Sequence, residues 1–282
     1  MRSIVLFLRE IRIEHTLFAL PFAYVGAILA ARGIPTLSAL AWITVAVLGA
    51  RTAAMAANRF LDREIDARNP RTARRALASG TLSPATMLWA SAGGLTLLLV
   101  AAWMLNPLCV KLMPLAALLL LAYPLCKRFT WTTHFVLGAV DGLAPLGAYI
   151  GIAGALTVPA LLLFLAVTIW VAGFDIIYAL MDLGIDRAQG IRSLPVRFGE
   201  ASGRVLPLLL HGAMLLLLGG AGLLAGAGRV YFLGVLSVAV LIIYEEHLFR
   251  SGVNLFVINE RIFISNMTFS VFFLLTTVGG YA

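Results

Sequence analysis

The chain has 282 residues, of which 61% are hydrophobic and only 12% are charged. Soluble globular domains carry about twice that charged fraction, so the composition excludes such a domain. Lysine and arginine exceed the acids by 21 to 13, a net charge of +8, but no segment is polar for long enough to form a nucleic-acid-binding surface. The mean hydropathy of +0.99 indicates a chain whose main partner is the lipid bilayer.

Apolar runs separated by turn residues predict nine membrane-spanning helices. A span needs about 20 apolar residues, and the turns at Asn106-Pro107 and Thr157-Val158-Pro159 divide two runs of double length. We therefore expect an all-α, polytopic membrane protein that forms a single domain over residues 1–282. The predicted spans are 16–33, 37–57, 84–104, 108–126, 133–153, 158–181, 205–225, 230–248 and 262–281.

The basic residues are distributed unevenly across the predicted membrane. If the N-terminus is cytoplasmic, 17 of the 21 lysines and arginines fall on the cytoplasmic side. Cytoplasmic loops of membrane proteins carry such an excess. The sequence thus predicts a multi-pass membrane protein with its N-terminus inside the cell. The location we expect for it is the bacterial inner (plasma) membrane.

Six of the thirteen acids lie in two segments at the predicted cytoplasmic ends of helices. Carboxylates near membrane depth are costly and typically mark functional sites. In the first segment, Asn58, Asp62 and Asp66 are four residues apart and share one helical face, on which Arg51 lies deeper in the membrane. The second segment aligns its carboxylates in the same way, at Asp175, Asp182 and Asp186.

The two acidic segments repeat at a constant interval. Asp62 precedes Asp182 by 120 residues, and Asp66 precedes Asp186 by the same number. This match favours a functional site over the alternative of ordinary solvated loop charges with accidental spacing. It suggests an internal duplication, with one site between halves of about 1–130 and 131–282.

Opposed carboxylates beside many basic side chains suit a polyanion that is held through a metal ion. Mg²⁺ prefers carboxylate and phosphate oxygens as ligands. Arginines and Lys127 would neutralise the remaining charge of a phosphate group. The chemistry predicted from these residues is therefore the Mg²⁺-assisted binding of a phosphate-bearing substrate at the cytoplasmic face, with the active site toward the cytoplasm.

At these residues the sequence resembles the UbiA superfamily of intramembrane aromatic prenyltransferases. The first family motif, NxxxDxxxD with a basic loop after it, matches Asn58 to Asp66 and Asn69 to Gly80, and a YxxxK pair matches Tyr123 and Lys127. The opening segment, Arg12 to Pro21, is most similar to 4-hydroxybenzoate polyprenyltransferases and to relatives that prenylate dihydroxynaphthoate. The second family motif matches Asp175, Tyr178, Ala179, Asp182, Asp186, Gly190, Ser193, Pro195, Phe198 and Gly199.

The resemblance implies nine helices around a central cavity, with Mg²⁺ bridging a prenyl diphosphate. Tyr123 would stabilise positive charge at the allylic carbon, and Arg51 would bind the carboxylate of the acceptor. Asp175 would assist the removal of the ring proton or orient the phenol. The equally favoured alternative is a hydrogen-bond partner that orients metal ligands. The metal ligands implied are Asn58, Asp62, Asp66, Asp182 and Asp186. The substrate contacts implied are Arg51, Arg63, Arg71, Lys127, Tyr178 and Ser193, and the catalytic residues are Asp175, Tyr123 and Lys127.

The expected function is Mg²⁺-dependent transfer of a polyprenyl group from polyprenyl diphosphate to an aromatic hydroxy acid of the 4-hydroxybenzoate type, in quinone biosynthesis. The alternative acceptor is 1,4-dihydroxy-6-naphthoate, for menaquinone. A membrane transporter is an alternative of another class, but its ionisable residues would lie near the membrane midplane. No nucleic acid and no protein partner is inferred.

We also predict roles or positions for several polar residues and glycines inside the predicted helices. Asp141 is expected either to form an interhelical hydrogen bond or to carry a protonated carboxyl, with a functional role as the less favoured alternative. Asn259 and Asn266 either line the acceptor pocket or pack helices through their amides. Glycines at 219, 220 and 222 are expected to allow close helix packing. The histidines show no ligand spacing and are expected at the membrane interface: His15, His134, His211 and His247.

Overall fold

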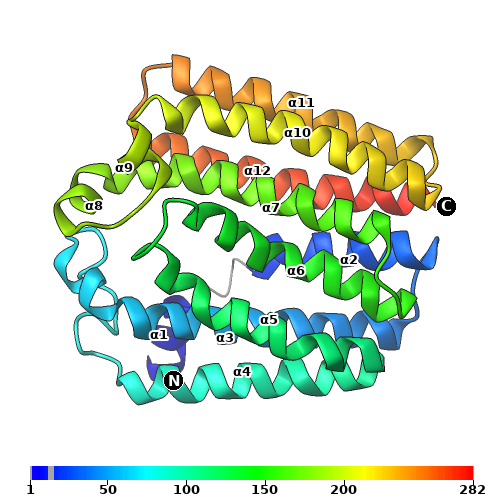
Figure 1. Cartoon of the computed structure of the whole chain (residues 1–282), viewed down its shortest axis with the longest axis horizontal. Coiled ribbons are helices and arrows are strands. Elements are labelled where there is room, and N and C mark those ends of the chain that lie inside the picture. The colour runs from blue at the N-terminus through cyan, green and yellow to red at the C-terminus, as the bar shows by residue number, and fades with distance from the viewer. Residues whose placement is uncertain (1, 12–15, 282) are drawn as a thin grey trace.

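The computed structural model describes residues 2–11 and 16–281, which form helices joined by short loops (Figure 1). Over these residues, eight helical segments are long and apolar enough to span a membrane, and α2 adds a shorter apolar helix over Ala19–Ala31. In chain order the elements are α1 (Arg2–Glu10), α2 (Thr16–Ala31), α3 (Leu37–Arg68), α4 (Pro84–Leu105), α5 (Pro107–Cys126), α6 (Thr133–Ala153), α7 (Val158–Ala179), the 3₁₀ turn η2 (Leu180–Asp182), α8 (Leu183–Gln189), α9 (Leu194–Phe198), α10 (Ser202–Ala225), α11 (Arg229–Arg250) and α12 (Leu255–Gly279).

The all-α membrane fold is confirmed, whereas some predicted helix ends are wrong. Helix α3 continues past the predicted end at residue 57 to Arg68, so the first acidic motif is the last part of a membrane-spanning helix. Its acids reduce the hydropathy of that segment without breaking its helical spacing. Helix α12 begins at Leu255 rather than 262, because the Asn254 side chain accepts a hydrogen bond from the Val257 backbone N–H at 3.0 Å and caps the helix.

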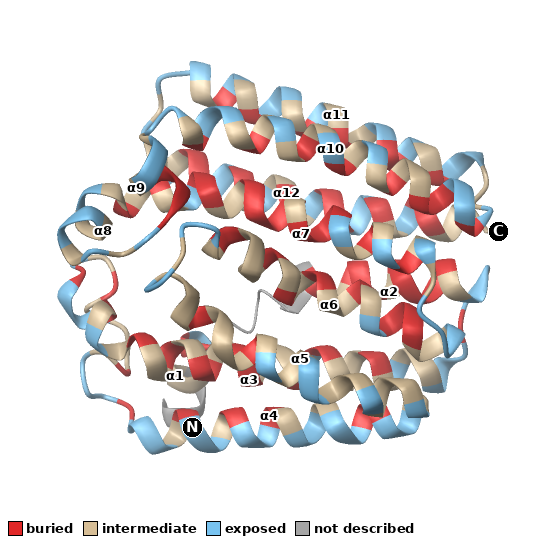
Figure 2. Ribbon diagram, in the orientation of Figure 1, coloured by how far each residue is buried: buried red, intermediate tan, exposed pale blue. Residues whose placement is uncertain are grey.

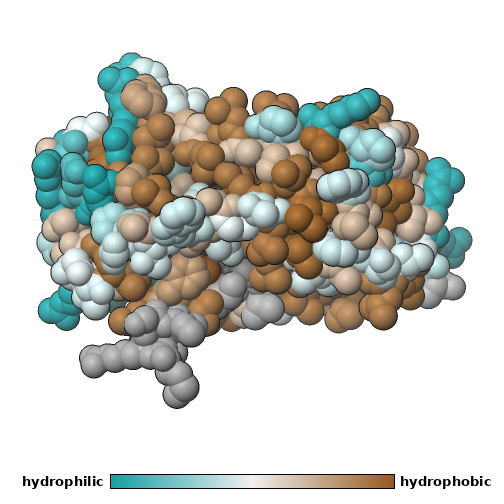
Figure 3. Space-filling view, turned by 90° about the horizontal axis from the view of Figure 1, so that it is seen from below, coloured by the Kyte–Doolittle hydropathy of each residue, from teal (hydrophilic) through white to brown (hydrophobic). Residues whose placement is uncertain are grey.

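The loops that carry the motifs gather at one end of the bundle. Figure 1 shows α1, α8, α9 and the loop after α3 at this end, while the C-terminus lies at the other. In Figure 3, hydrophobic residues cover the middle of the visible face and hydrophilic residues lie toward its two ends. This is the pattern of a bundle with its sides in lipid and its loops in water.

The helices of the second half, together with α2, pack into a continuous core, to which α7 contributes more buried residues than any other helix (Figure 2). Trp170 of α7 lies against Phe22 of α2, with ring centroids 4.9 Å apart, and against Phe269 of α12 at 5.4 Å. Close backbone approach between α6 and α7 depends on Gly138, because a Cβ atom there would lie 2.0 Å from the Thr168 carbonyl oxygen. The core therefore fixes α7, and with it the second motif.

His134, in the first turn of α6, and His211, within α10, are both buried inside the protein. A buried histidine needs hydrogen-bond partners, and each has a carboxylate from another helix. The His211 ring lies 2.7 Å from Glu245 of α11. His247 is exposed, as expected. His15 and the rest of the segment 12–15 lie outside the described residues.

The asparagines and glycines named above differ in what they contact. Asn266 accepts a hydrogen bond from the Trp170 indole N–H at 2.8 Å, and Asn259 donates to the Leu255 carbonyl of its own helix at 2.9 Å. Both asparagines thus serve helix structure. A Cβ atom on Gly222 would meet the Tyr231 ring at 2.2 Å, whereas one on Gly219 would meet nothing within 4 Å. Close packing is therefore confirmed for Gly222 and wrong for Gly219.

Candidate active site

The first motif forms a buried polar cluster on one face of α3. Asn58 donates a hydrogen bond from Nδ2 to Oδ2 of Asp62 at 3.0 Å, one helical turn away. Lys127, just after α5, places its Nζ 2.5 Å from the same oxygen. The other oxygen of Asp62, Oδ1, is buried and has no hydrogen-bond partner within the described structure. Asp62 therefore has one oxygen bound by lysine and one that accepts no hydrogen bond and lies 3.9 Å from Nη2 of Arg128.

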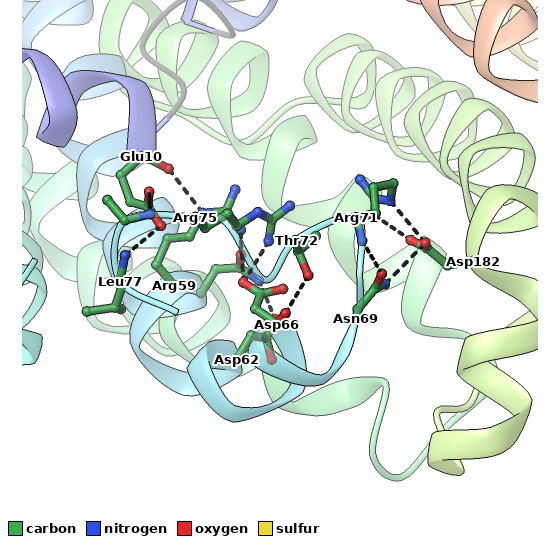
Figure 4. Close-up of polar contacts among 12 residues, drawn as sticks. Glu10, Arg59, Asp62, Asp66, Asn69, Arg71, Thr72, Arg75, Leu77 and Asp182 are labelled. Carbon is green, nitrogen blue, oxygen red and sulfur yellow. Dashed lines mark hydrogen bonds and ion pairs between the residues drawn. The ribbon is translucent and has the colours of Figure 1, made fainter. Parts of the chain in front are cut away.

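The basic loop after α3 folds back over the end of that helix. Arg75 places Nη1 2.7 Å from Oδ2 of Asp66, and the Thr72 hydroxyl donates to the Asp66 carbonyl at 2.9 Å. The side chain of Glu10, at the end of α1, accepts a hydrogen bond from the Ala76 backbone N–H at 2.9 Å. Figure 4 shows this loop between the two acidic motifs, anchored at Glu10 and Asp66.

The same loop joins the first motif to the second. Arg71 donates from Nε to Oδ1 of Asp182 at 2.9 Å and from Nη2 to Oδ2, so it binds the carboxylate with two nitrogens. Asn69 donates to Asp182 at 3.2 Å, and Arg71 also donates to the Tyr178 hydroxyl at 2.7 Å. Burial lowers the pKa of Arg71, but its hydrogen bonds to Asp182 and Tyr178 outweigh burial and raise it. Arg71 is therefore a permanent cation between the halves.

Three residues of the predicted site lie outside this network of contacts. Asp186 follows Asp182 by one turn on α8 and is half-buried. Arg63 donates to the Phe60 carbonyl at 2.8 Å and lies 3.4 Å from Glu64 along the outer face of α3. The Ser193 hydroxyl oxygen accepts from the Val196 backbone N–H at 3.3 Å and caps α9. No hydrogen bond or ion pair in the described part of the chain joins these three side chains to Asp62 or Lys127, although Asp186 lies within electrostatic range of Asp182 and Lys127.

Asp175 of α7 is held by a histidine that sequence reasoning did not connect with it. His134 Nδ1 lies 2.7 Å from Oδ2 of Asp175, and His134 Nε2 accepts a hydrogen bond from the Leu194 backbone N–H at 3.3 Å. Since Nε2 is the acceptor, Nδ1 carries the proton and donates it to Asp175. The pair fixes the orientation of a carboxylate that is one-quarter exposed.

A cavity of about 310 Å³ lies below this end of the bundle, mainly between α3, α4, α5 and α6. Its walls are almost entirely apolar. Among the lining residues described, the charged or hydroxyl-bearing side chains are those of Arg51, Tyr123 and Asp141. Arg51 and Asp141 form the expected interhelical contact, with Nη1 and Oδ1 3.0 Å apart. Tyr123 precedes Lys127 by one helical turn, so the cavity begins where the acidic cluster ends.

The donor set of the two motifs suits a hard divalent cation. Carboxylate and amide oxygens are the ligands that Mg²⁺ prefers, and Asp62 Oδ1 is a buried oxygen without a hydrogen-bond partner. Within residues 2–11 and 16–281, however, no three His, Cys, Asp or Glu side chains stand close enough to hold a metal by themselves. Substrate oxygens would have to complete the coordination.

The residues that complete this site were missed at the level of sequence. Some contact the motifs or the motif loop from distant segments, which no local spacing reveals, whereas Arg59 lies within α3 and contacts Asn58 and Asp66 of its own helix. The clustering of bases in the loop after α3 was the one available signal, and it identified the loop but not the pairings. These residues are Glu10, Arg59, Asn69, Arg75, Arg128 and His134.

Comparison with known proteins gives consistent matches along the chain. The model of the UbiA prenyltransferase family matches residues 19–266. Two curated relatives are the 4-hydroxybenzoate octaprenyltransferases of Alkalilimnicola ehrlichii, 35% identical over 80% of this chain and 76% of that protein, and of Nitrosococcus oceani, 34% identical over 79% and 78%.

Solved structures agree with the fold. A UbiA homolog from Aeropyrum pernix K1, in its apo form, superimposes with a TM-score of 0.81 at 32% identity and covers 95% of this chain and 96% of its own. A UbiA homolog from Archaeoglobus fulgidus bound to GPP and Mg²⁺ gives a TM-score of 0.71 at 19% identity, over 97% and 99%. At that lower identity the second likeness concerns the fold alone.

Proposed function

Since this chain belongs to the UbiA prenyltransferase family, and is therefore a membrane-embedded prenyltransferase, we propose that it transfers a polyprenyl group from polyprenyl diphosphate to a hydroxylated aromatic carboxylate of the 4-hydroxybenzoate type. The observation that carries this proposal is the junction of the two motifs. Lys127 meets Asp62 and Arg71 meets Asp182, and Tyr123, one helical turn before Lys127, lines an apolar cavity. This arrangement suits a molecule with an anionic head and an apolar tail.

Each group in the junction has a separate task in the proposed reaction. Lys127 and Arg71 leave their carboxylate partners to bind diphosphate oxygens, and Arg63 approaches from the outer face of α3. These cations stabilise the negative charge that develops on the leaving diphosphate as the allylic C–O bond breaks. Tyr123 stabilises the positive charge on the allylic carbon with its ring. The apolar cavity walls exclude water, which would otherwise trap the cation as an alcohol.

The acceptor side of the reaction uses Arg51 and Asp175. Arg51 binds the acceptor carboxylate through hydrogen bonds. Asp175 is oriented by His134. It either orients the phenol or accepts the ring proton once the carbon–carbon bond has formed. Tyr178 and Ser193 belong to the substrate contacts of the second motif.

Mg²⁺ is the proposed cofactor, and when bound it would neutralise diphosphate charge. Asn58, Asp62, Asp66, Asp182 and Asp186 are the proposed ligands, supported by their oxygen donors and by Oδ1 of Asp62, which accepts no hydrogen bond within the described residues. Two relatives are named for an octaprenyl transfer to 4-hydroxybenzoate, which supports quinone biosynthesis as the context.

We place the protein in the bacterial inner membrane with this site toward the cytoplasm. Because the matches are to transferases, the transporter alternative is set aside.

A membrane assay tests the proposal. Membranes that contain the chain are given a radiolabelled polyprenyl diphosphate with 4-hydroxybenzoate or with 1,4-dihydroxy-6-naphthoate, each with Mg²⁺ or with EDTA. We expect a lipid-soluble labelled product with 4-hydroxybenzoate, and its loss with EDTA. Product with the naphthoate alone would instead assign the chain to menaquinone synthesis. Product from neither acceptor would contradict the proposed function.

A further inference from the structure

Arg51 and Asp141 form an ion pair in the wall of an otherwise apolar cavity. Arg51 lies on α3 and Asp141 on α6, and their Nη1 and Oδ1 atoms are 3.0 Å apart. Both side chains are mostly enclosed, with exposed fractions of 17% and 11%, and both line the cavity. The pair is therefore a feature of the cavity itself and not a contact on the outer surface.

The charge of Arg51 is already balanced inside this cavity. The pair is joined through Nη1 of Arg51 and Oδ1 of Asp141. The edge of the guanidinium formed by Nε and Nη2 can still donate hydrogen bonds to an incoming group. A carboxylate at that edge would place a second negative charge beside a single positive one. In apolar surroundings an unbalanced charge is costly, whereas a neutral hydrogen-bond acceptor is not.

We propose that Asp141 determines acceptor selectivity: the Arg51–Asp141 pair recognises the polar substituent of the acceptor by hydrogen bonding and does not select for negative charge. This inference rests on the proposed function, which assigns Arg51 to the acceptor. A neutral carboxamide should then bind at least as well as the corresponding carboxylate. Removing the charge of Asp141 should convert the cavity into one that prefers the carboxylate.

The test compares 4-hydroxybenzoate with 4-hydroxybenzamide on the full chain in lipid nanodiscs. Dissociation constants come from calorimetry, and kcat/KM comes from prenyl transfer. In Asp141→Asn the side-chain oxygen can still accept the hydrogen bond from Arg51, but the charge is lost. We expect the ratio of carboxylate to carboxamide binding to rise at least tenfold in this variant. The repulsion that is removed, between like charges about 6 Å apart at an effective dielectric constant of about 20, corresponds to more than a tenfold change in binding. The KM for prenyl diphosphate should not change.

Glu200→Gln is the matched control, because it makes the same chemical change at an exposed ion pair with Arg204, 3.1 Å apart and outside the cavity. Its ratio should equal that of the unmodified protein. If Asp141→Asn does not fold, the ratio in the unmodified protein decides by itself. A value near one, or in favour of the carboxamide, supports the proposal.

Two results would overturn the proposed selectivity. One is an unmodified protein that binds the carboxylate at least tenfold more tightly than the carboxamide. The other is a folded Asp141→Asn variant whose ratio of carboxylate to carboxamide binding is unchanged. If the unmodified protein still transfers prenyl groups, this second result leaves the proposed function intact. Transfer to neither compound contradicts the proposed function, and the selectivity falls with it.

Discussion

Single residues of the two motifs are each held by a basic side chain from another segment. Asp62 contacts Lys127, and Asp182 contacts Arg71. A buried carboxylate without a partner is strongly unfavourable, so these cations stabilise the charged form of the acids and hold them in position. A diphosphate attracts the same cations. Substrate binding can therefore exchange one anionic partner for another without leaving a cation unpaired.

Arg71→Lys tests this exchange. A lysine cannot reproduce the two hydrogen bonds from Nε and Nη2 to Asp182, nor a forked contact to a phosphate. We expect the KM for prenyl diphosphate to rise by about tenfold, the value of one charge-assisted hydrogen bond. Steady-state kinetics at saturating acceptor measure it. Arg74→Lys, exposed on the same loop, is the control, and an unchanged KM in Arg71→Lys would refute the exchange.

His134→Ala tests whether the histidine orients Asp175. Without the hydrogen bond at 2.7 Å, the carboxylate loses its fixed orientation. We expect kcat to fall roughly 10- to 100-fold, as for other residues that orient a reactive group. The KM for prenyl diphosphate should stay the same. His247→Ala, at an exposed position, should have neither effect. A loss of kcat and a rise in KM together would indicate general damage instead.

The acids could be predicted from the sequence, whereas their partners could not. The spacing of Asn58, Asp62 and Asp66 places them on one helical face whatever the rest of the chain does. The partners follow no local period. Glu10 reaches Ala76, and His134 reaches Asp175, only because tertiary packing brings α1 to the loop after α3 and α6 to α7.

At the level of whole elements, the long apolar helices were predictable, whereas the helix ends and the short helices α1, α8 and α9 were not. Long apolar runs specify helices by length alone. The end of α3 was missed because hydropathy falls at the acidic motif, although the helix continues through it to Arg68. The packing of α6 on α7 depends on Gly138, whose neighbour across the interface is a backbone carbonyl that a pattern of residue types does not identify.

Gly138→Ala should destabilise the bundle. The added Cβ would lie 2.0 Å from the Thr168 carbonyl oxygen, so the two helices must separate. Overpacking of this kind costs about 1–3 kcal/mol of unfolding free energy. Thermal unfolding in detergent should therefore show a lower Tm. Gly219→Ala, with nothing within 4 Å of the added atom, should leave Tm unchanged or raised. Equal Tm values for the two variants would contradict the packing account.

For the molecule as a whole, the two halves have different interiors. Helices α3 to α6 line most of the cavity, while α7, α10, α11 and α12 build the other core together with α2. The sequence predicts a cavity only through the family resemblance, because the volume of the cavity depends on the gaps that side chains from several helices leave between them. The matched acids at a 120-residue interval did predict that both halves contribute to one end of the bundle.

The orientation of the whole molecule can be tested by cysteine labelling. In a background without Cys109 and Cys126, a cysteine at exposed Glu64 marks the end with the motifs, and one at Ile34, 76% exposed, marks the other end. The excess of basic residues predicts that a membrane-impermeant maleimide labels Ile34→Cys in intact cells and Glu64→Cys only after lysis. The reverse pattern would show that the N-terminus is outside.

The central claim is that one acid from each half of the chain helps to hold a single diphosphate. It is tested most directly by measuring the binding of a non-reactive geranyl thiodiphosphate to the unmodified protein, Asp62→Asn and Asp182→Asn, each with Mg²⁺ or EDTA. We predict binding that requires Mg²⁺ and that weakens at least tenfold in either variant, the loss expected for a carboxylate ligand or its orienting partner. Binding that persists unchanged in one of the two variants would contradict a shared site.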